Sequence, residues 1–297
     1  MIKNVVYLKK VFSKLVAVII SALSILLSVI TFIFPNLTEN WECCIIGKVF
    51  ILVLCFAGLF LIIFFISLIA TKLKRKNTIW QKGCRSVTIV YDDIFKLKSK
   101  KKDSKKKYIV ISVDTQFMTQ VDEDTFKVKN PCVSINTLHG KFIKQFYETE
   151  SKVAALDSEI SEYISLKGYQ PDSAQMAKYQ NSSKNRYEIG TVVEVQPTND
   201  SHFLLLAVSE FDENNNAHSS KEFLVKSLVS LLEFYNKNCQ GNDLYIPLIG
   251  TSLSRIELSD EQSLQIIRAT IEQNLNYVHG NVNIVVYEKN RSSVSIF

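Results

Sequence analysis

The sequence of 297 residues lacks the short motifs that mark the common catalytic and metal sites. It contains no Walker motif, no HExxH, no nucleophile elbow and no protein-kinase motif. Its six cysteines form no CxxC pair, and they show no metal-ligand spacing with the four histidines. We therefore expect the cysteines to be small core residues, and we expect neither a metal site nor a resident cofactor. With these motifs absent, the sequence gives only weak support to a catalytic function.

Charge is missing from two long stretches near the N-terminus. Residues 15–34 hold no charged side chain over 20 positions, and residues 49–70 hold none over 22. As a helix, each stretch is long enough to span the roughly 30 Å hydrocarbon core of a bilayer. Lysine and arginine flank the pair on both outer sides, so the positive-inside rule places both termini in the cytoplasm. The sequence thus predicts a multi-pass hairpin over residues 1–76 in the cell membrane, in contact with lipid.

A cleaved signal peptide is the alternative interpretation of residues 15–34. Signal peptides have a shorter apolar core, and a small-x-small cleavage site closes it. The stretch here is longer, no such site follows, and a second apolar stretch comes almost at once. We therefore expect two retained spans.

The rest of the chain alternates apolar strands with amphipathic helices, which indicates an α/β fold with a mixed sheet. We expect a linker over 77–85 and one domain over 86–297. In such folds ligands bind outside the carboxyl ends of strands, here the loops after Val113, Val208 and Leu248. The expected strands are 86–91, 108–113, 191–195, 203–208, 244–248 and 282–287, and the expected helices are 140–148, 151–165, 220–237 and 259–276.

Residues 96–107 hold eight lysines against one aspartate. We expect a solvated loop, and attraction to anionic lipid headgroups is the alternative function. No aromatic side chains are interleaved with these lysines, so we expect no nucleic-acid partner.

The loop after Leu248 reads IGTSLSR and has the composition of an anion-binding turn. Gly250 can adopt a positive φ, and the backbone N–H groups of a strand-to-helix turn can form an anion nest. Thr251, Ser252 and Ser254 add hydroxyl donors, and Arg255 adds a forked one. An ordinary turn with hydroxyl caps is the alternative.

The other two loops also offer polar or aromatic side chains. Asp114 follows an apolar strand and can accept hydrogen bonds from an adenine amine or a ribose hydroxyl, or it can cap the next turn. Phe211 can stack on a base that Asp212 reads, or both can belong to a surface loop. His139 can act as a general base only with a partner that orients it, and the sequence marks none. We therefore expect a packing role for His139.

Three segments together resemble a known family. The segments YIVISVDTQFMTQV…SINTLHGKFI, YEIGTVVEV…HFLLLAVSEFDENNNA and IPLIGTSLSRIELSD occur in this order, and they resemble the macro domain of Thoeris anti-phage defence effectors. The resemblance covers about residues 86–297. Ser252 stands where the family usually has a second glycine. The apolar hairpin in front is similar to one branch of these effectors.

The resemblance implies an α/β/α sandwich that binds ADP-ribose derivatives. The ligand would be a signal, a histidine conjugate of ADP-ribose, made by a TIR-domain partner protein. Binding would drive assembly of a homo-oligomer that disrupts the membrane, so the chain would be a sensor and not an enzyme. A membrane-anchored ADP-ribosyl hydrolase that uses the same pocket is the alternative, and a scaffold without nucleotide affinity is a third possibility.

The resemblance also assigns residues to the ligand. It places one group after the second strand of the domain, one near the distal ribose, one around the phosphates, and one near the adenine or the far end. In that order the residues are Asp114, Thr115 and Phe117; Leu138, His139 and Gly140; Gly250, Thr251, Ser252, Leu253 and Ser254; and Phe211 and Asp212.

Overall fold

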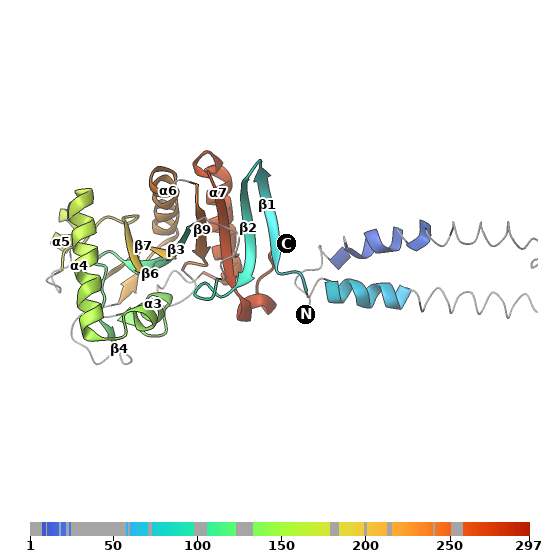
Figure 1. Cartoon of the computed structure of the whole chain (residues 1–297), viewed down its shortest axis with the longest axis horizontal. Helices are drawn as coiled ribbons and strands as arrows, with labels where there is room; N and C mark the ends of the chain where they lie inside the picture. The colour runs from blue at the N-terminus through green and yellow to red at the C-terminus, as the bar shows by residue number, and fades with distance from the viewer. Residues whose placement is uncertain are drawn as a thin grey trace, which may run out of the picture. The chain divides into compact units, whose positions relative to one another are not determined.

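A computed structural model gives the fold of the chain, and Figure 1 shows it with its elements labelled. The structure describes residues 8–9, 11–17, 19–21, 24, 58, 60–70, 73–97, 106–122, 133–178, 184–198, 201–212, 216–239, 241–250 and 258–297. The chain divides into two compact units, Met1–Arg75 with Ser295–Phe297, and Lys76–Val294. The second unit contains the sheet and the helices that cover it.

The main sheet has eight strands in the order β1-β2-β10-β9-β3-β7-β6, with β8 paired to β7. The five strands from β2 to β7 in this order run parallel, and β1 and β6 pair antiparallel at the two edges. A separate pair is formed by β4 and β5. The strands are β1 Lys76–Lys82, β2 Arg85–Asp92, β3 Lys107–Asp114, β4 Val121–Asp122, β5 Val133–Ser134, β6 Val192–Thr198, β7 Ser201–Phe211, β8 Ala217–His218, β9 Asp243–Pro247 and β10 Asn281–Tyr287.

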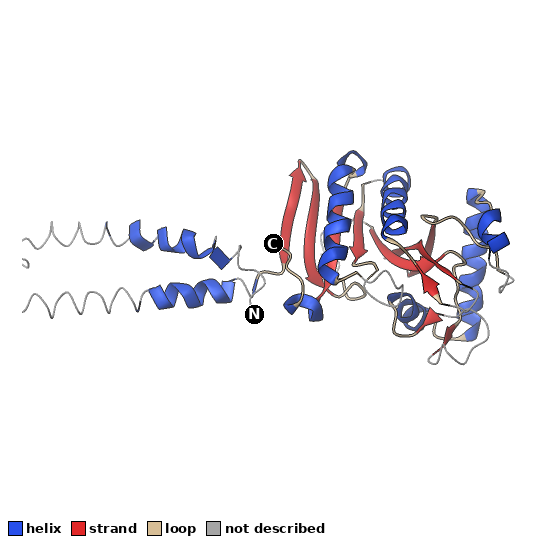
Figure 2. Cartoon of the chain, turned by 180° about the vertical axis from the view of Figure 1, so that it is seen from behind, coloured by secondary structure: helices blue, strands red, loops and turns tan. Residues whose placement is uncertain are grey.

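Helices cover both faces of this sheet, as the two views in Figures 1 and 2 show. Side chains alternate between the faces of a strand, and Ile109, Ile111 and Val113 of β3 share one buried cluster with α3 and α4. On the other face α6 packs against β7 and against its neighbour α7. The helices are α3 Leu138–Phe146, α4 Glu150–Lys167, α5 Ser173–Lys178, α6 Lys221–Asn238 and α7 Asp260–Gln273, with short 3₁₀ turns η2 Leu275–Tyr277 and η3 Glu288–Ser292.

Local sequence signals explain where the helices begin and end. The Ser259 hydroxyl accepts the Gln262 N–H and the Gln262 side chain accepts the Ser259 N–H, which forms a capping box at the start of α7. Thr137 caps the start of α3 in a similar way. Gly168 ends α4 in the left-handed conformation, with φ of 66°, which glycine adopts without strain.

Two predictions about the chain organisation differ from the structure. The segment 77–85, predicted as a linker, forms most of β1 and its turn into β2. The polar stretch 166–189, which holds none of the expected strands or helices, contains the short helix α5. The strand is hidden in the sequence because β1 lies at an edge, where its side chains stay partly exposed and need not be apolar. The predicted lysine-rich loop lies largely at 98–105, outside the described residues.

The prediction of a membrane location is wrong. No helix in the part of the chain that the structure describes is both long and apolar enough to cross a membrane. This finding overturns the multi-pass location with both termini in the cytoplasm. Most of the predicted span 15–34, and residues 49–57 and 59 of the predicted span 49–70, lie outside the described residues.

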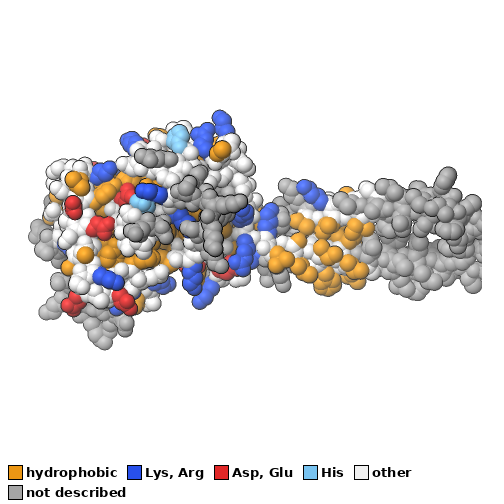
Figure 3. All heavy atoms as spheres, viewed as in Figure 1, with side chains coloured by type: hydrophobic (Ala, Val, Ile, Leu, Met, Phe, Trp, Pro, Cys, Tyr) orange, Lys and Arg blue, Asp and Glu red, His pale blue; other side chains and the backbone are white. Residues whose placement is uncertain are grey.

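Most described residues of the first unit are helical, and Phe12 meets the edge of Phe60 with ring centroids 5.0 Å apart. Several of their large apolar side chains are exposed, and they form an orange surface on this unit in Figure 3. They include Ile20, Phe60, Leu61, Ile62, Phe65 and Ile69.

Candidate functional site

The strand order of the main sheet changes direction at the boundary between β9 and β3. From β3 the chain continues through α3 and α4 to β7, and from β9 it continues through α7 to β10, on the opposite side. The two strands are direct parallel neighbours in the sheet. In open α/β sheets such a reversal leaves a crevice at the carboxyl ends of the strands, where ligands bind. The loops after β3 and β9, two of the three predicted from the sequence, flank this point.

Asp114 lies at the end of β3 and is 4% exposed. Its carboxylate accepts hydrogen bonds from the backbone N–H of Gln116 at 2.8 Å and of Met118 at 3.3 Å. Burial raises the pKa of this carboxyl, while the two N–H groups and the charge of Lys184 act in the opposite direction. The carboxylate therefore shapes the loop 114–118 from within.

The rest of this loop is also buried. The hydroxyl oxygen of Thr115 is buried and has no hydrogen-bond partner among the residues that the structure describes. Phe117, 1% exposed, adopts φ of 50°, a conformation that is uncommon outside glycine. Strained backbone of this kind persists only where surrounding contacts hold it. The tilted ring of Tyr187, with its centroid 6.0 Å from that of Phe117, is one such contact.

Arg186 is the main residue that the sequence did not reveal. It lies in a polar segment, yet it is 1% exposed and among the largest fully buried side chains. Its guanidinium donates to the carbonyl oxygen of Phe211 at 2.8 Å. With the Gln116 amide turned so that its oxygen faces the guanidinium, this oxygen accepts two more bonds at 2.9 and 3.0 Å. Arg186 therefore joins the loop after β3 to the end of β7.

Leu138, His139 and Gly140 form the start of α3, and Leu138 packs against the buried cluster that contains Phe117 and Met118. A Cβ on Gly140 would lie 2.2 Å from the carbonyl oxygen of Ser134, so only glycine allows this approach of α3 to β5. His139 is 5% exposed. Burial, with the Lys184 charge as a second cause, lowers the pKa of its imidazole to about 3. His139 is thus neutral near pH 7 and a poor general base.

The buried neutral His139 predicts acid sensitivity. Between its ordinary pKa of 6.5 and about 3, the unfolded chain binds a proton that the folded imidazole does not. The contribution of the neutral imidazole to the free energy of unfolding is therefore fully present above pH 6.5, and it is lost as the pH falls towards 3. We expect the loss to be on the order of a few kcal/mol, at about 1.4 kcal/mol for each pKa unit. Urea unfolding at several pH values measures it.

In His139→Phe, stability should depend less on pH in this window than in the wild type. The raised pKa of Asp114 acts with the opposite sign, but it is common to both proteins and cancels in the difference. His218→Asn is the control, because that side chain is 46% exposed. Parallel pH profiles for wild type and His139→Phe would contradict the prediction.

Phe211 and Asp212, at the end of β7, have different environments. Phe211 is buried and pairs with Ala217 of β8. The Asp212 carboxylate accepts the N–H of Asn216 at 2.8 Å and lies 2.7 Å from Nε2 of His218. Its oxygens thus close the β7–β8 hairpin, which is the structural alternative that the sequence left open.

The turn after β9 starts from a fixed backbone. The Ser263 hydroxyl, on the first turn of α7, donates to the carbonyl of Ile249 at 2.6 Å and accepts its N–H at 3.1 Å. Gly250 follows with φ of 85°, which confirms the positive φ expected of it. The predicted contacts Thr251, Ser252, Leu253, Ser254 and Arg255 lie outside the described residues.

Comparison with known proteins now assigns the family. The family model described as "Thoeris protein ThsA, Macro domain" matches residues 87–287. This range covers more than half of the chain and includes the sheet from β2 to β10. The chain belongs to this family. The predicted macro-type α/β sandwich with a mixed sheet is confirmed.

The comparisons also find individual similar proteins. The Thoeris protein ThsA of Bacillus amyloliquefaciens (strain Y2) is 26% identical over 210 residues, which cover 71% of this chain and 63% of that protein. The match thus spans less than two thirds of the curated relative. Among solved structures, the Oceanobacillus iheyensis macrodomain with ADP is 14% identical, with a TM-score of 0.45 over 74% of this chain and 93% of its own. The Trypanosoma brucei macrodomain in complex with ADP-ribose is 10% identical, with a TM-score of 0.36 over 67% of this chain and 63% of its own.

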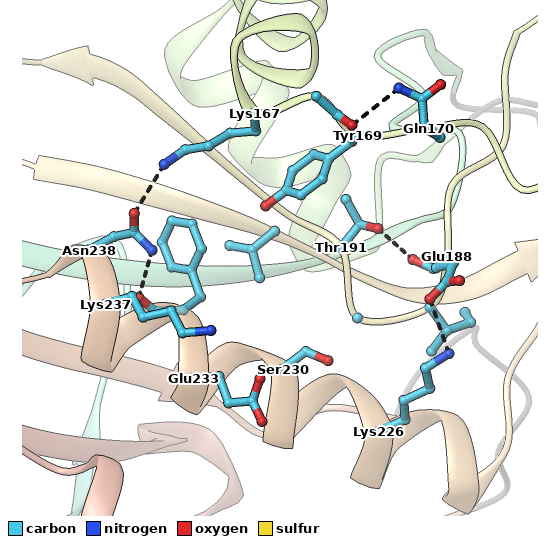
Figure 4. Close-up of a pocket in the computed structure, with 15 residues that line it drawn as sticks. Lys167, Tyr169, Gln170, Glu188, Thr191, Lys226, Ser230, Glu233, Lys237 and Asn238 are labelled. Carbon is cyan, nitrogen blue, oxygen red and sulfur yellow. Dashed lines mark hydrogen bonds and ion pairs between the residues drawn. The ribbon is translucent and has the colours of Figure 1, made fainter.

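Two cavities of about 620 Å³ each are lined by described residues of the macro domain. The first lies between the end of α4 and α6 (Figure 4). Two of its lysines already have partners in the cavity wall. Lys226 lies 3.5 Å from Glu188, and Lys167 donates to the side-chain oxygen of Asn238 at 3.0 Å. The second lies between residues 118–121 and helices α3 and α4. Neither is lined by a residue predicted to touch the ligand.

Proposed function

We propose that the chain is an effector of Thoeris anti-phage defence whose macro domain binds an ADP-ribose-derived signal. The observation that carries this proposal is the buried carboxylate of Asp114 at the reversal of strand order. Beside it the Thr115 hydroxyl is buried without a partner. A carboxylate and a hydroxyl at this position suit a ligand with amine and hydroxyl donors, such as an adenine amine and ribose hydroxyls.

The turn after β9 supplies the complementary chemistry for the diphosphate. Gly250 follows β9, which is the direct neighbour of β3 in the sheet, and β3 leads into the loop 114–118. The positive φ of Gly250 suits a backbone nest for an anion. We assign residues 250–255 to the phosphates, and Leu138, His139 and Gly140 to the distal ribose. Phe211 contributes to the adenine end.

The signal itself is proposed to be a histidine conjugate of ADP-ribose made by a TIR-domain partner protein. Binding would favour an assembled form of the chain, by as much as the ligand's affinity differs between the two states. The low pKa of His139, about 3, favours a sensor over the alternative hydrolase, because such an imidazole accepts a proton poorly near pH 7.

Calorimetry of the full chain with ADP-ribose and with its histidine conjugate tests the proposal. We expect saturable binding of both, tighter for the conjugate, and mass spectrometry should recover the conjugate intact. Conversion of the conjugate to products would favour the hydrolase, and absence of binding to either ligand would overturn the nucleotide site. A shortened chain must keep residues 76–82, because they form the edge strand β1.

A further inference from the structure

The segment 184–187, which we name the clasp, contacts the loop 114–119 along its length. Lys184 lies 2.8 Å from Asp157 of α4, which also accepts the hydroxyl of Thr119. The N–H of Tyr187 donates to the carbonyl of Thr115 at 2.9 Å. Arg186 contacts Gln116 from within the clasp. The conformation of the loop therefore depends on a segment about 70 residues further along the sequence.

Arg186 is the buried part of the clasp and stays charged at any ordinary pH. A buried charge is tolerated only where hydrogen bonds compensate for the lost water. The contacts found here are the side-chain oxygen of Gln116 and the main-chain oxygen of Phe211. The planar guanidinium suits these acceptors because its N–H donors are fixed in a fork. The compact ammonium of a lysine cannot donate to both acceptors in this way.

One of these acceptors lies in the loop after β3 and the other at the end of β7. Gln116 lies two residues after Asp114, and its own N–H donates to the Asp114 carboxylate at 2.8 Å. Phe211 is the last residue of β7. A shift of the guanidinium therefore moves the Asp114 loop, and a shift at the end of β7 reaches the same loop through Arg186.

We propose that Arg186 is a positioning residue for the nucleotide site: it holds the loop 114–118 in the conformation that accepts ligand and couples this loop to the end of β7. The inference rests on the proposed nucleotide site for its functional part. It also makes a claim about the unliganded protein, namely that the N–H groups of Gln116 and Met118 stay bonded to Asp114 only while Arg186 is in place.

The test measures amide hydrogen exchange and ligand affinity in Arg186→Lys and Arg186→Gln. We expect the Gln116 and Met118 amides to exchange at least about tenfold faster, while the amide of Val285 in β10 changes no more than the global stability requires. Affinity for ADP-ribose should fall by about tenfold or more, as expected for the loss of bonds to a charged group. Gln116→Met, which removes the amide acceptor, should act in the same direction.

Two controls separate positioning from general destabilisation. Val87→Ala removes buried apolar atoms from β2, and it should lower stability without a selective effect on the Gln116 and Met118 amides. Arg268→Gln removes an exposed arginine paired with Glu272, and it should change neither measurement.

Unchanged exchange at Gln116 and Met118 in folded Arg186 variants would overturn the inference, whatever the ligand does. The same holds if Val87→Ala, at an equal loss of stability, loosens these two amides as much. If the amides respond as expected but wild type binds no ADP-ribose, the positioning role stands and the proposed function fails. The two failures are thus distinguishable.

Discussion

Asp114→Ala should lower the affinity for ADP-ribose by about a hundredfold or more, measured by calorimetry. The change removes the acceptor that we propose for the ligand, and a bond to a charged group contributes about 1.5–3 kcal/mol. It also frees the N–H groups of Gln116 and Met118, which both donate to this carboxylate. Since about 1.4 kcal/mol corresponds to a tenfold change in affinity, two such losses account for the expected factor.

Asp212→Ala is the matched control for this substitution. Both aspartates follow an apolar strand and accept hydrogen bonds from their own turns, but Asp114 lies at the reversal of strand order, whereas Asp212 lies at the β7–β8 hairpin. We expect Asp212→Ala to change the affinity by less than about threefold, with at most a small loss of stability of about 1 kcal/mol. Equal effects of the two substitutions would contradict the central place given to Asp114.

The contrast between these aspartates shows where sequence analysis succeeds and where it stops. Apolar runs identify β3 and β7 because both strands are buried on two faces, and the carboxyl-end rule then selects the residues that follow. The pattern of a carboxylate after a strand is the same in both places. Asp212 bonds within its own hairpin because β8 pairs with the end of β7. The sequence does not predict this pairing, since β8 follows a polar loop without strand signals.

Arg186 and β1 escaped prediction for related reasons. Arg186 stands in a polar stretch, and its burial depends on contacts with Gln116 and Phe211, which are distant in sequence. The edge strand β1 reads KNTIWQK, too polar for a strand by composition, because an edge strand needs to bury only part of its surface. In contrast, α7 was predictable in type and in its start, since its capping box is a local signal.

Gly250→Val should abolish measurable binding of ADP-ribose while the domain stays folded. Gly250 has φ of 85°, and an L-residue in the left-handed region costs about 1–2 kcal/mol, more for a β-branched side chain. Since Ile249 is fixed to Ser263 on one side, the strain cannot be relieved by moving the end of β9. The turn itself must change conformation, and the backbone N–H groups proposed to hold the diphosphate then point elsewhere.

Gly168→Val provides a control with the same kind of backbone strain. Gly168 has φ of 66°, and a Cβ built on it meets no atom within 4 Å. It ends α4 and lines the cavity of Figure 4 rather than the switch point. We expect a similar loss of stability, about 1–2 kcal/mol, with ligand affinity unchanged. A folded Gly250→Val protein that binds ADP-ribose like wild type would remove the turn after β9 from the site, and the phosphates would then need other donors around the crevice.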